Sequence, residues 1–238
     1  MRPLHIFFLV APLLSVVCSF EPLWQDQAPI VFALYIIVSS VVIQLLLARL
    51  WVTLSMLAVN LSAGLVTVYL WANFLLAYQK ARVLTLLDPE RDPLGTGWNI
   101  IQSRIAIGSG GPTGKGFLQG TQTKYEFLPA AHTDFIFSVI GEELGFMGAV
   151  FVLALFLFLI WRALYIGTMA NSRFASLLAV GLGSILTFHV FVNVGMTIGV
   201  MPVTGLPLPF LSYGGSSLMT NALAVGLLLH IYAHRHEY

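Results

Sequence analysis

Cysteine is nearly absent from this 238-residue chain, which contains only Cys18. A single cysteine cannot close an internal disulfide, and no set of Cys and His residues has the spacing of metal ligands. Charge is also scarce, since 9% of the residues are charged and the net charge is +1. Because no basic run or aromatic–basic patch occurs, we expect no nucleic-acid partner.

Long polar stretches are rare as well, since apolar residues make up 58% of the chain and the mean hydropathy is +0.89. Apolar runs long enough to cross a bilayer, about 20 residues, recur along it. The sequence therefore predicts an all-α polytopic membrane protein that folds as one integral membrane domain over residues 1–238. The six expected transmembrane helices cover residues 4–20, 29–48, 52–77, 135–161, 175–199 and 214–233.

The first apolar run could be a signal peptide, but no Ala-x-Ala cleavage site follows it, so we expect an uncleaved helix. Arginines favour one orientation for the six helices. With both ends in the cytoplasm, the short outer loops 21–28 and 200–213 contain no Lys or Arg. The inner side then holds Arg2, Arg49, Arg162, Arg173 and Arg235. This distribution follows the positive-inside rule and places residues 78–134 outside as a large extracytoplasmic loop.

Two segments of the outer side stand out. Within the large loop, Trp98–Ile107 is predicted to be an amphipathic helix with Trp98, Ile101 and Ile105 on its apolar side. The glycine-rich residues 108–120 that follow are predicted to form a loop. Residues 201–217 interrupt an apolar stretch with three prolines and three glycines. Because non-helical backbone at membrane depth must be buried in protein or line a cavity, they predict a re-entrant loop.

The glycine-rich loop fails the test for a nucleotide-binding P-loop. Position 109 is Ser rather than Gly, and Lys115 is followed by Gly116 rather than Ser or Thr. Two interpretations stay open. The loop is either plainly flexible, or its free backbone N–H groups cradle a diphosphate together with Lys115 and Arg104.

Several polar residues have both a structural and a functional interpretation. Asp134 either caps a helix that starts there or acts as a general base at the membrane surface. Glu142, expected two turns further along the same helix, either faces the same cavity or forms a structural pair with a basic residue or backbone donors. His189, Asn193 and Thr197 form a stripe on the fifth span, which most often indicates hydrogen bonds between helices.

Seven short stretches together resemble one known family. They are Gln102–Gly111, Gly114–Gln122, Phe127–Pro129, His132–Phe137, Gly141–Phe146, Val192–Met196 and Pro202–Ser217. The chain from about Tyr78 to Ile231 is similar to the SEDS family (shape, elongation, division and sporulation) of polytopic peptidoglycan glycosyltransferases. The Gly-Lys-Gly and Gly-Thr-Gln pattern is closer to the rod-shape branch, RodA, than to the division branch, FtsW.

The resemblance implies an inverting glycosyltransferase that polymerises lipid II, with the growing glycan on undecaprenyl diphosphate as donor, for cell elongation and cell shape. Asp134 matches the family's essential aspartate and would be the catalytic base. Other matching residues would bind substrate: Arg104 (usually lysine in the family), Lys115, Gln122, His132, Thr133, Glu142, Ser212 and Tyr213. A divalent cation such as Mg²⁺ or Mn²⁺ at the diphosphate is left open. The implied partner is a class B penicillin-binding protein, a transpeptidase, in the bacterial cytoplasmic membrane, with the site on the extracytoplasmic side.

The chain departs from the family at its beginning. SEDS proteins usually have more spans than six, and the earlier motifs Gln-Pro-Ser-Glu and Gln-Pro-Asp-Leu-Gly-Thr are not found here. The sequence therefore represents either a chain that lacks the family's first half or a divergent short form. Two other functions stay open beside the enzyme: a non-catalytic scaffold of the cell-wall synthesis complex, and a flippase for lipid-linked precursors.

Overall fold

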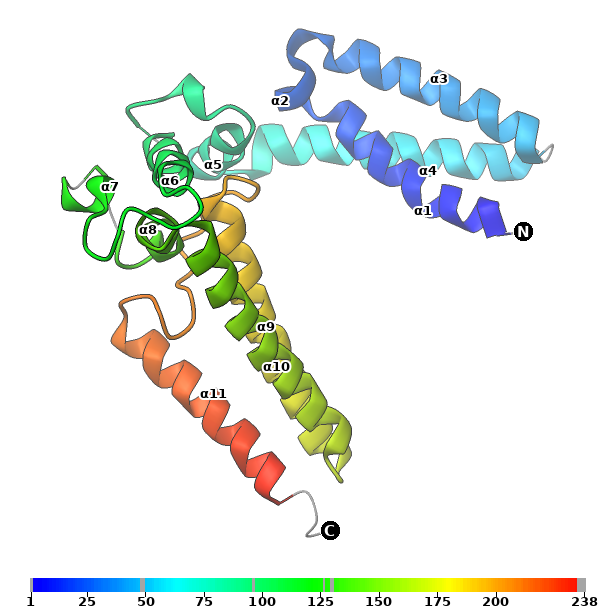
Figure 1. The fold of residues 1–238 in the computed structure, drawn as a ribbon. Coiled ribbons are helices and arrows are strands. Elements are labelled where there is room, and N and C mark those ends of the chain that lie inside the picture. The colour runs from blue at the N-terminus through cyan, green and yellow to red at the C-terminus, as the bar shows by residue number, and fades with distance from the viewer. Residues whose placement is uncertain (1, 48–49, 96, 126, 129–130, 235–238) are drawn as a thin grey trace. The chain divides into compact units, whose positions relative to one another are not determined.

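The computed structural model describes residues 2–47, 50–95, 97–125, 127–128 and 131–234. All regular secondary structure in these ranges is helical (Figure 1), so the predicted all-α class is confirmed. The chain forms two compact units, Met1–Leu87 and Asp88–Tyr238, which we describe separately. Three residues named in the sequence analysis lie outside the described residues. They are Arg49 and Arg235, on which the predicted orientation partly rests, and Pro129, which belongs to one of the stretches that resemble the family.

The first unit consists of three long apolar helices, one further helix and short connecting elements. They are α1 (Arg2–Ser19), α2 (Glu21–Trp24), η1 (Gln25–Gln27), α3 (Ala28–Leu47), α4 (Leu50–Tyr69), the π-helix η2 (Leu70–Phe74) and α5 (Ala77–Leu87). α1, α3 and α4 all contact one another. Polar groups join them, because the Ser15 hydroxyl donates to the Asn60 carbonyl and the Tyr35 hydroxyl to the Ala11 carbonyl.

The second unit holds all the candidate site residues. Its elements are η3 (Pro89–Arg91), α6 (Trp98–Ser109), α7 (Thr121–Lys124), α8 (Ile136–Glu143), α9 (Gly145–Met169), α10 (Arg173–Thr197) and α11 (Gly215–Ala233). α9 and α10 lie side by side along their length, and α11 contacts both (Figure 1). Small residues allow the close approach of α9 and α10, since a methyl group added to Gly183 would lie 3.3 Å from the Ala163 methyl carbon.

Among the described residues, four helices are long and apolar enough to cross a membrane: Trp51–Phe74, Gly145–Met169, Arg173–Thr197 and Gly215–Ala233. The chain is therefore a multi-pass membrane protein. The predicted third, fifth and sixth spans match three of these helices. The predicted first and second spans coincide with the helices α1 and α3, whose stretches Val10–Ser19 and Ala28–Ile43 are apolar. The count of six spans stays a prediction.

The predicted fourth span, residues 135–161, is wrong in its boundaries. α8 ends at Glu143, and α9 begins at Gly145, whose φ of +67° lies in the left-handed region. A methyl group on Gly145 would lie 2.2 Å from the Gly114 nitrogen. Glu142 and Glu143 therefore end a short separate helix and are not inside a span.

The polar segment 78–134 contains short helices, and α6 confirms the helix predicted at Trp98–Ile107. The buried side of α6 is Ile100, Ser103 and Ala106, whereas the predicted apolar side is half-buried or exposed. Between α10 and α11, residues 201–214 form no helix, as predicted, whereas residues 215–217 of the predicted loop already belong to α11. Whether this loop re-enters the membrane stays a prediction.

Candidate active site

The three residues before Phe135, the N-cap residue of α8, are fixed through their backbone carbonyls. The Tyr213 N–H donates to the His132 carbonyl at 2.8 Å. The Ser212 hydroxyl donates to the Thr133 carbonyl at 2.6 Å, and Asn193 Nδ2 donates to the Asp134 carbonyl at 2.9 Å. The His-Thr-Asp segment is thus held by α10 and by the loop before α11, which are distant in sequence.

The same partners also fold the 201–214 loop. The Leu208 N–H donates to the Ser212 hydroxyl at 2.7 Å, and Asn193 Nδ2 donates to the Leu206 carbonyl at 2.7 Å. His189 Nδ1 lies 3.4 Å from the Pro207 carbonyl. The polar stripe on α10 therefore faces the loop at two of its three residues, and the prediction of bonds between helices is wrong for His189 and Asn193. Among the described residues, the member of this stripe that is hydrogen-bonded to another helix is Thr197, whose carbonyl accepts from the Ser103 hydroxyl on α6 at 2.6 Å.

The Asp134 side chain is partly exposed. Its Oδ2 would lie 3.4 Å from a methyl group added to Gly205, so the carboxylate faces the loop. The N-cap residue of α8 is Phe135, and no side chain caps this helix, so the helix-cap interpretation of Asp134 is wrong. Among the described residues, no hydrogen bond reaches the Asp134 carboxylate.

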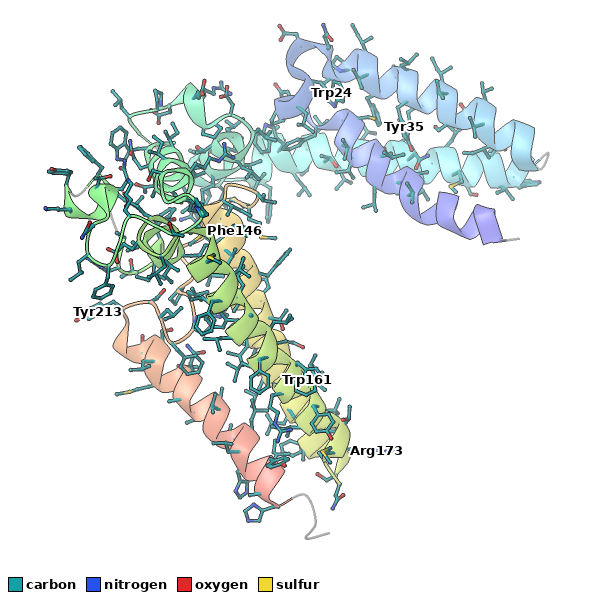
Figure 2. All side chains as sticks on the ribbon, in the orientation of Figure 1. Trp24, Tyr35, Phe146, Trp161, Arg173 and Tyr213 are labelled. Carbon is teal, nitrogen blue, oxygen red and sulfur yellow. The ribbon has the colours of Figure 1, made fainter. Side chains whose placement is uncertain are left out.

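A pocket of about 550 Å³ lies beside this segment, within the size range of small-molecule sites. It is bounded by the start of α8, the end of the 201–214 loop and the start of α11. His132 and Ile136 line it, but Asp134, midway between them, does not. The pocket is therefore not built around the carboxylate. Tyr213, labelled in Figure 2, also lines the pocket and is 82% exposed.

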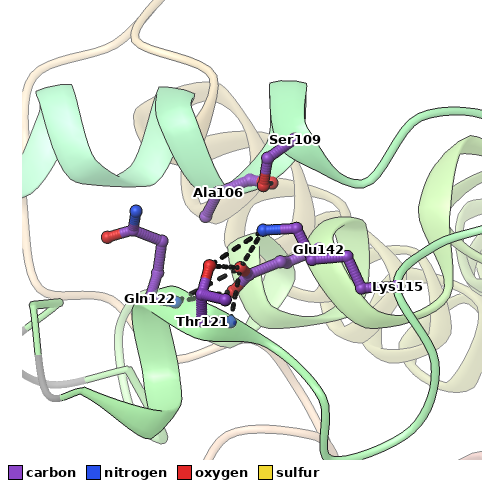
Figure 3. A network of polar contacts seen from close by, with 6 residues as sticks. All are labelled: Ala106, Ser109, Lys115, Thr121, Gln122 and Glu142. Carbon is purple, nitrogen blue, oxygen red and sulfur yellow. Dashed lines mark hydrogen bonds and ion pairs between the residues drawn. The ribbon is translucent and has the colours of Figure 1, made fainter.

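Glu142 is the centre of a second polar cluster (Figure 3). Its side chain is fully buried and pairs with Lys115 Nζ at 2.7 Å. Its Oε1 also accepts from the Thr121 hydroxyl at 2.9 Å and from the Thr121 and Gln122 backbone N–H groups at 2.8 and 3.2 Å. Of the two interpretations left open by the sequence, the structural pair is the one observed.

These contacts determine the charge of Glu142. Burial raises the pKa of its carboxyl group, but the hydrogen bonds from Lys115, Gln122 and Thr121 outweigh burial and hold the pKa below its ordinary value. Glu142 is therefore ionised at neutral pH, and Lys115 supplies the neutralising charge. Because Lys115 Nζ also donates to the Thr121 hydroxyl at 2.9 Å, two of its three hydrogens are engaged.

The glycine-rich loop provides hydrogen-bond partners for the backbone groups at the break between α8 and α9. The N–H groups of Lys115 and Gly116 donate to the Glu142 and Glu143 carbonyls at the end of α8, both at 3.0 Å. On the other side, the Phe146 N–H at the start of α9 donates to the Gly111 carbonyl at 2.8 Å. The backbone N–H groups of Lys115 and Gly116 are therefore not free to cradle a diphosphate, whereas the proposed role of the Lys115 side chain toward substrate stays a prediction.

The remaining predicted residues lie apart from these clusters. Arg104 is exposed, and its Nη2 donates to the Gly199 carbonyl just beyond α10 at 3.0 Å. Gln122 contributes its backbone to the Glu142 cluster, while its buried side-chain oxygen has no partner among the described residues. Sequence reasoning missed the contact of Thr121 with Glu142 and the contact of Asn193 with the Asp134 carbonyl. Both lie in stretches of the family resemblance, which was the only signal that could have found them.

No three His, Cys, Asp or Glu side chains in the described part of the chain gather closely enough to hold a metal ion.

A sequence model of the FtsW, RodA and SpoVE family, described as cell cycle protein, matches residues 4–237. The peptidoglycan glycosyltransferase MrdB of Escherichia coli K12 is 52% identical over 178 residues, covering 75% of this chain and 48% of MrdB. The probable peptidoglycan glycosyltransferase FtsW of Idiomarina loihiensis is 41% identical over 236 residues, covering 97% of this chain and 53% of that protein.

A solved structure concerning the coordination of polymerization and crosslinking by a peptidoglycan synthase complex is similar in fold. Its matching chain has a TM-score of 0.60 and 31% identity, over 99% of this chain and 71% of that one. The chain spans about half the length of the curated relatives it matches. The family match nevertheless runs through nearly all of it, and the chain belongs to the FtsW/RodA/SpoVE family.

Proposed function

We propose that this chain forms the catalytic part of a peptidoglycan glycosyltransferase, which polymerises lipid II into glycan strands at the outer face of the bacterial cytoplasmic membrane. Family membership and the names of the relatives support this reaction. The observation that carries it is the state of Asp134. Its carboxylate accepts no hydrogen bond from the described residues, while three consecutive carbonyls, its own included, are bonded to α10 and the loop before α11.

In this proposal Asp134 is the general base. It takes the proton from the GlcNAc 4-hydroxyl of an incoming lipid II as that oxygen attacks the anomeric carbon of the growing strand. The bond from the anomeric carbon to the diphosphate oxygen breaks, and undecaprenyl diphosphate leaves. Attack opposite the leaving group inverts the anomeric centre.

Arg104 is the stronger candidate for binding the diphosphate, because its guanidinium is exposed and a planar fork suits phosphate oxygens. Lys115 has one hydrogen left for substrate, so its main effect is on Glu142. We assign sugar binding to His132 and Tyr213, which line the 550 Å³ pocket. Gln122 and Thr133 remain proposed substrate residues, whereas the Ser212 hydroxyl is already engaged as donor and acceptor.

The proposal includes the arrangement in the membrane. Residues 1–238 act as one membrane domain of six spans, with residues 78–134 outside and residues 201–217 re-entrant. The protein would work in cell elongation and shape with a class B penicillin-binding protein, because a matching solved structure is described as coordinating polymerization with crosslinking in a synthase complex.

The test is polymerisation in reconstituted vesicles. Purified protein is mixed with lipid II, with and without a class B penicillin-binding protein, and products are separated on gels. We expect glycan strands whose formation depends on this protein. Transfer of fluorescent lipid II across the bilayer without strands would instead identify a flippase. If neither strands nor transfer occurred while the partner still bound, the protein would be a scaffold.

A further inference from the structure

We propose that Asn193 is a positioning residue that sets the direction of the Asp134 carboxylate. This inference rests on the proposed function, in which Asp134 is the base. Asn193 does not touch the carboxylate. It acts on the backbone of Asp134, from a fully buried position on α10.

Asn193 contacts the site through the two hydrogens of its side-chain amide. Nδ2 donates to the Asp134 carbonyl at 2.9 Å and to the Leu206 carbonyl at 2.7 Å. Two carbonyl acceptors require the donor end of the amide, which fixes the side-chain orientation. The Oδ1 atom is buried and has no partner among the described residues. Asn193 therefore joins the Asp134 segment to the loop that its carboxylate faces.

Among the described residues, no other contact orients the Asp134 carboxylate. Since no hydrogen bond from the described residues reaches the Asp134 side chain, its direction depends on the position of its backbone. Ser212 and Tyr213 hold the two preceding carbonyls, but both belong to the loop. Asn193 is the contact that ties Asp134 itself to a long helix. A displacement of about 1 Å at a reacting group can lower the rate about 100-fold.

Two substitutions and one matched control test the proposal. Asn193→Leu keeps the approximate volume and removes both donors. Asn193→Asp retains one donor when its buried carboxyl is protonated. The control is Asn221→Leu on α11, because Asn221 is also buried but donates within its own helix, to the Ser217 carbonyl at 2.8 Å.

We expect Asn193→Leu to lower the kcat of lipid II polymerisation about 10- to 100-fold with little change in KM. Asn193→Asp should fall between Leu and the unmodified protein, and Asn221→Leu should retain its kcat. Equal kcat for Asn193→Leu and the unmodified protein would overturn the inference. A change in KM alone would also overturn it, because that result indicates a role in substrate binding. Equal losses of kcat in the Leu and Asp variants would overturn it as well, because they indicate that Asn193 matters only for how its side chain fits.

Hydrogen exchange gives a reading that does not require activity. In Asn193→Leu the amides of residues 203–213 should exchange faster, while those in the middle of α9 should not. Unchanged exchange in residues 203–213 would overturn the positioning role whether or not strands form.

If the unmodified protein makes no strands, the proposed function fails. If it is active and Asp134→Asn is not, yet Asn193→Leu keeps full kcat, only this inference fails.

Discussion

At the scale of single residues, Glu142 shows how a buried charge is retained in this fold. Moving a carboxylate out of water is unfavourable, and burial alone would favour its neutral form. Lys115, Thr121 and the backbone of Gln122 together supply enough hydrogen bonds to keep it ionised. Removing one partner should therefore be costlier than removing the charge itself.

The first prediction compares Lys115→Met with Lys124→Met. Lys115→Met leaves the Glu142 carboxylate buried without its cation, so the free energy of unfolding should fall by about 2 kcal/mol, since Lys115 is partly exposed. Lys124 is exposed, and its replacement should change the unfolding free energy by less than about 0.5 kcal/mol. Denaturant titration in detergent measures both. Equal effects would show that the pair is energetically unimportant.

The second prediction concerns pH. The folded-state pKa of Glu142 lies below the ordinary value of 4.5. The unfolded chain therefore binds the proton more readily, and the stabilisation is complete above pH 4.5 and is lost as the pH falls through the folded pKa. Thermal unfolding of Glu142→Gln should depend less on pH below that value than unfolding of the unmodified protein. Parallel pH profiles would contradict the assignment.

At the scale of elements, the break between α8 and α9 organises the site, because it lets α8 lie apart from the membrane span. Glycines make the break sterically feasible. Gly114 has φ +80°, and a methyl group there would lie 2.0 Å from the Glu143 carbonyl oxygen. No other residue type fits at this position without moving α8 away from the loop.

The third prediction follows from this contact. Gly114→Ala should lower the free energy of unfolding by roughly 3 kcal/mol or more, because both the backbone conformation and the space are unsuitable. Gly108→Ala is the matched control, since Gly108 lies in α6 with nothing within 4 Å of the added methyl. That variant should be neutral or more stable by about 0.5–1 kcal/mol. A mild effect at Gly114 would mean that the loop does not cap α8 closely.

This break also shows where sequence reasoning reaches its limit. Apolar composition predicts the helices, because it reports directly on what can lie in a membrane. It cannot reveal that a continuous helical pattern is interrupted at Gly145, because the cause is contact with Gly114, far away in the chain. The pairing of Glu142 with Lys115 is non-local in the same way. For the candidate site, the sequence offers candidate residues, whose roles stay predictions, but not the grouping of some of them into two clusters.

At the scale of the whole molecule, the arrangement of the helices in the membrane determines which side the site faces. Arg173 is the first residue of α10 and follows the α9–α10 connection, at the end of the unit opposite to Tyr213 (Figure 2). In the proposed orientation, which follows the positive-inside rule, this connection lies in the cytoplasm and Asp134 outside. The two ends of the unit should thus differ in their access to reagents.

The fourth prediction uses the single native cysteine. In a Cys18→Ser background, Tyr125→Cys and Asn171→Cys each introduce one exposed thiol, the first beyond α7 and the second between α9 and α10. A membrane-impermeant maleimide added outside intact cells should label Tyr125→Cys only. Labelling of Asn171→Cys alone would invert the proposed orientation and place the candidate base in the cytoplasm.

The central claim, that Asp134 is the base of a lipid II polymerase, is tested most directly by the rate of glycan formation in Asp134→Asn. The control is Asp26→Asn, which removes an exposed carboxylate in the first unit. We expect Asp134→Asn to fold normally and to lose about 10²- to 10⁴-fold in polymerisation rate, with Asp26→Asn unchanged. A folded Asp134→Asn protein that polymerises lipid II at nearly the unmodified rate would contradict the claim.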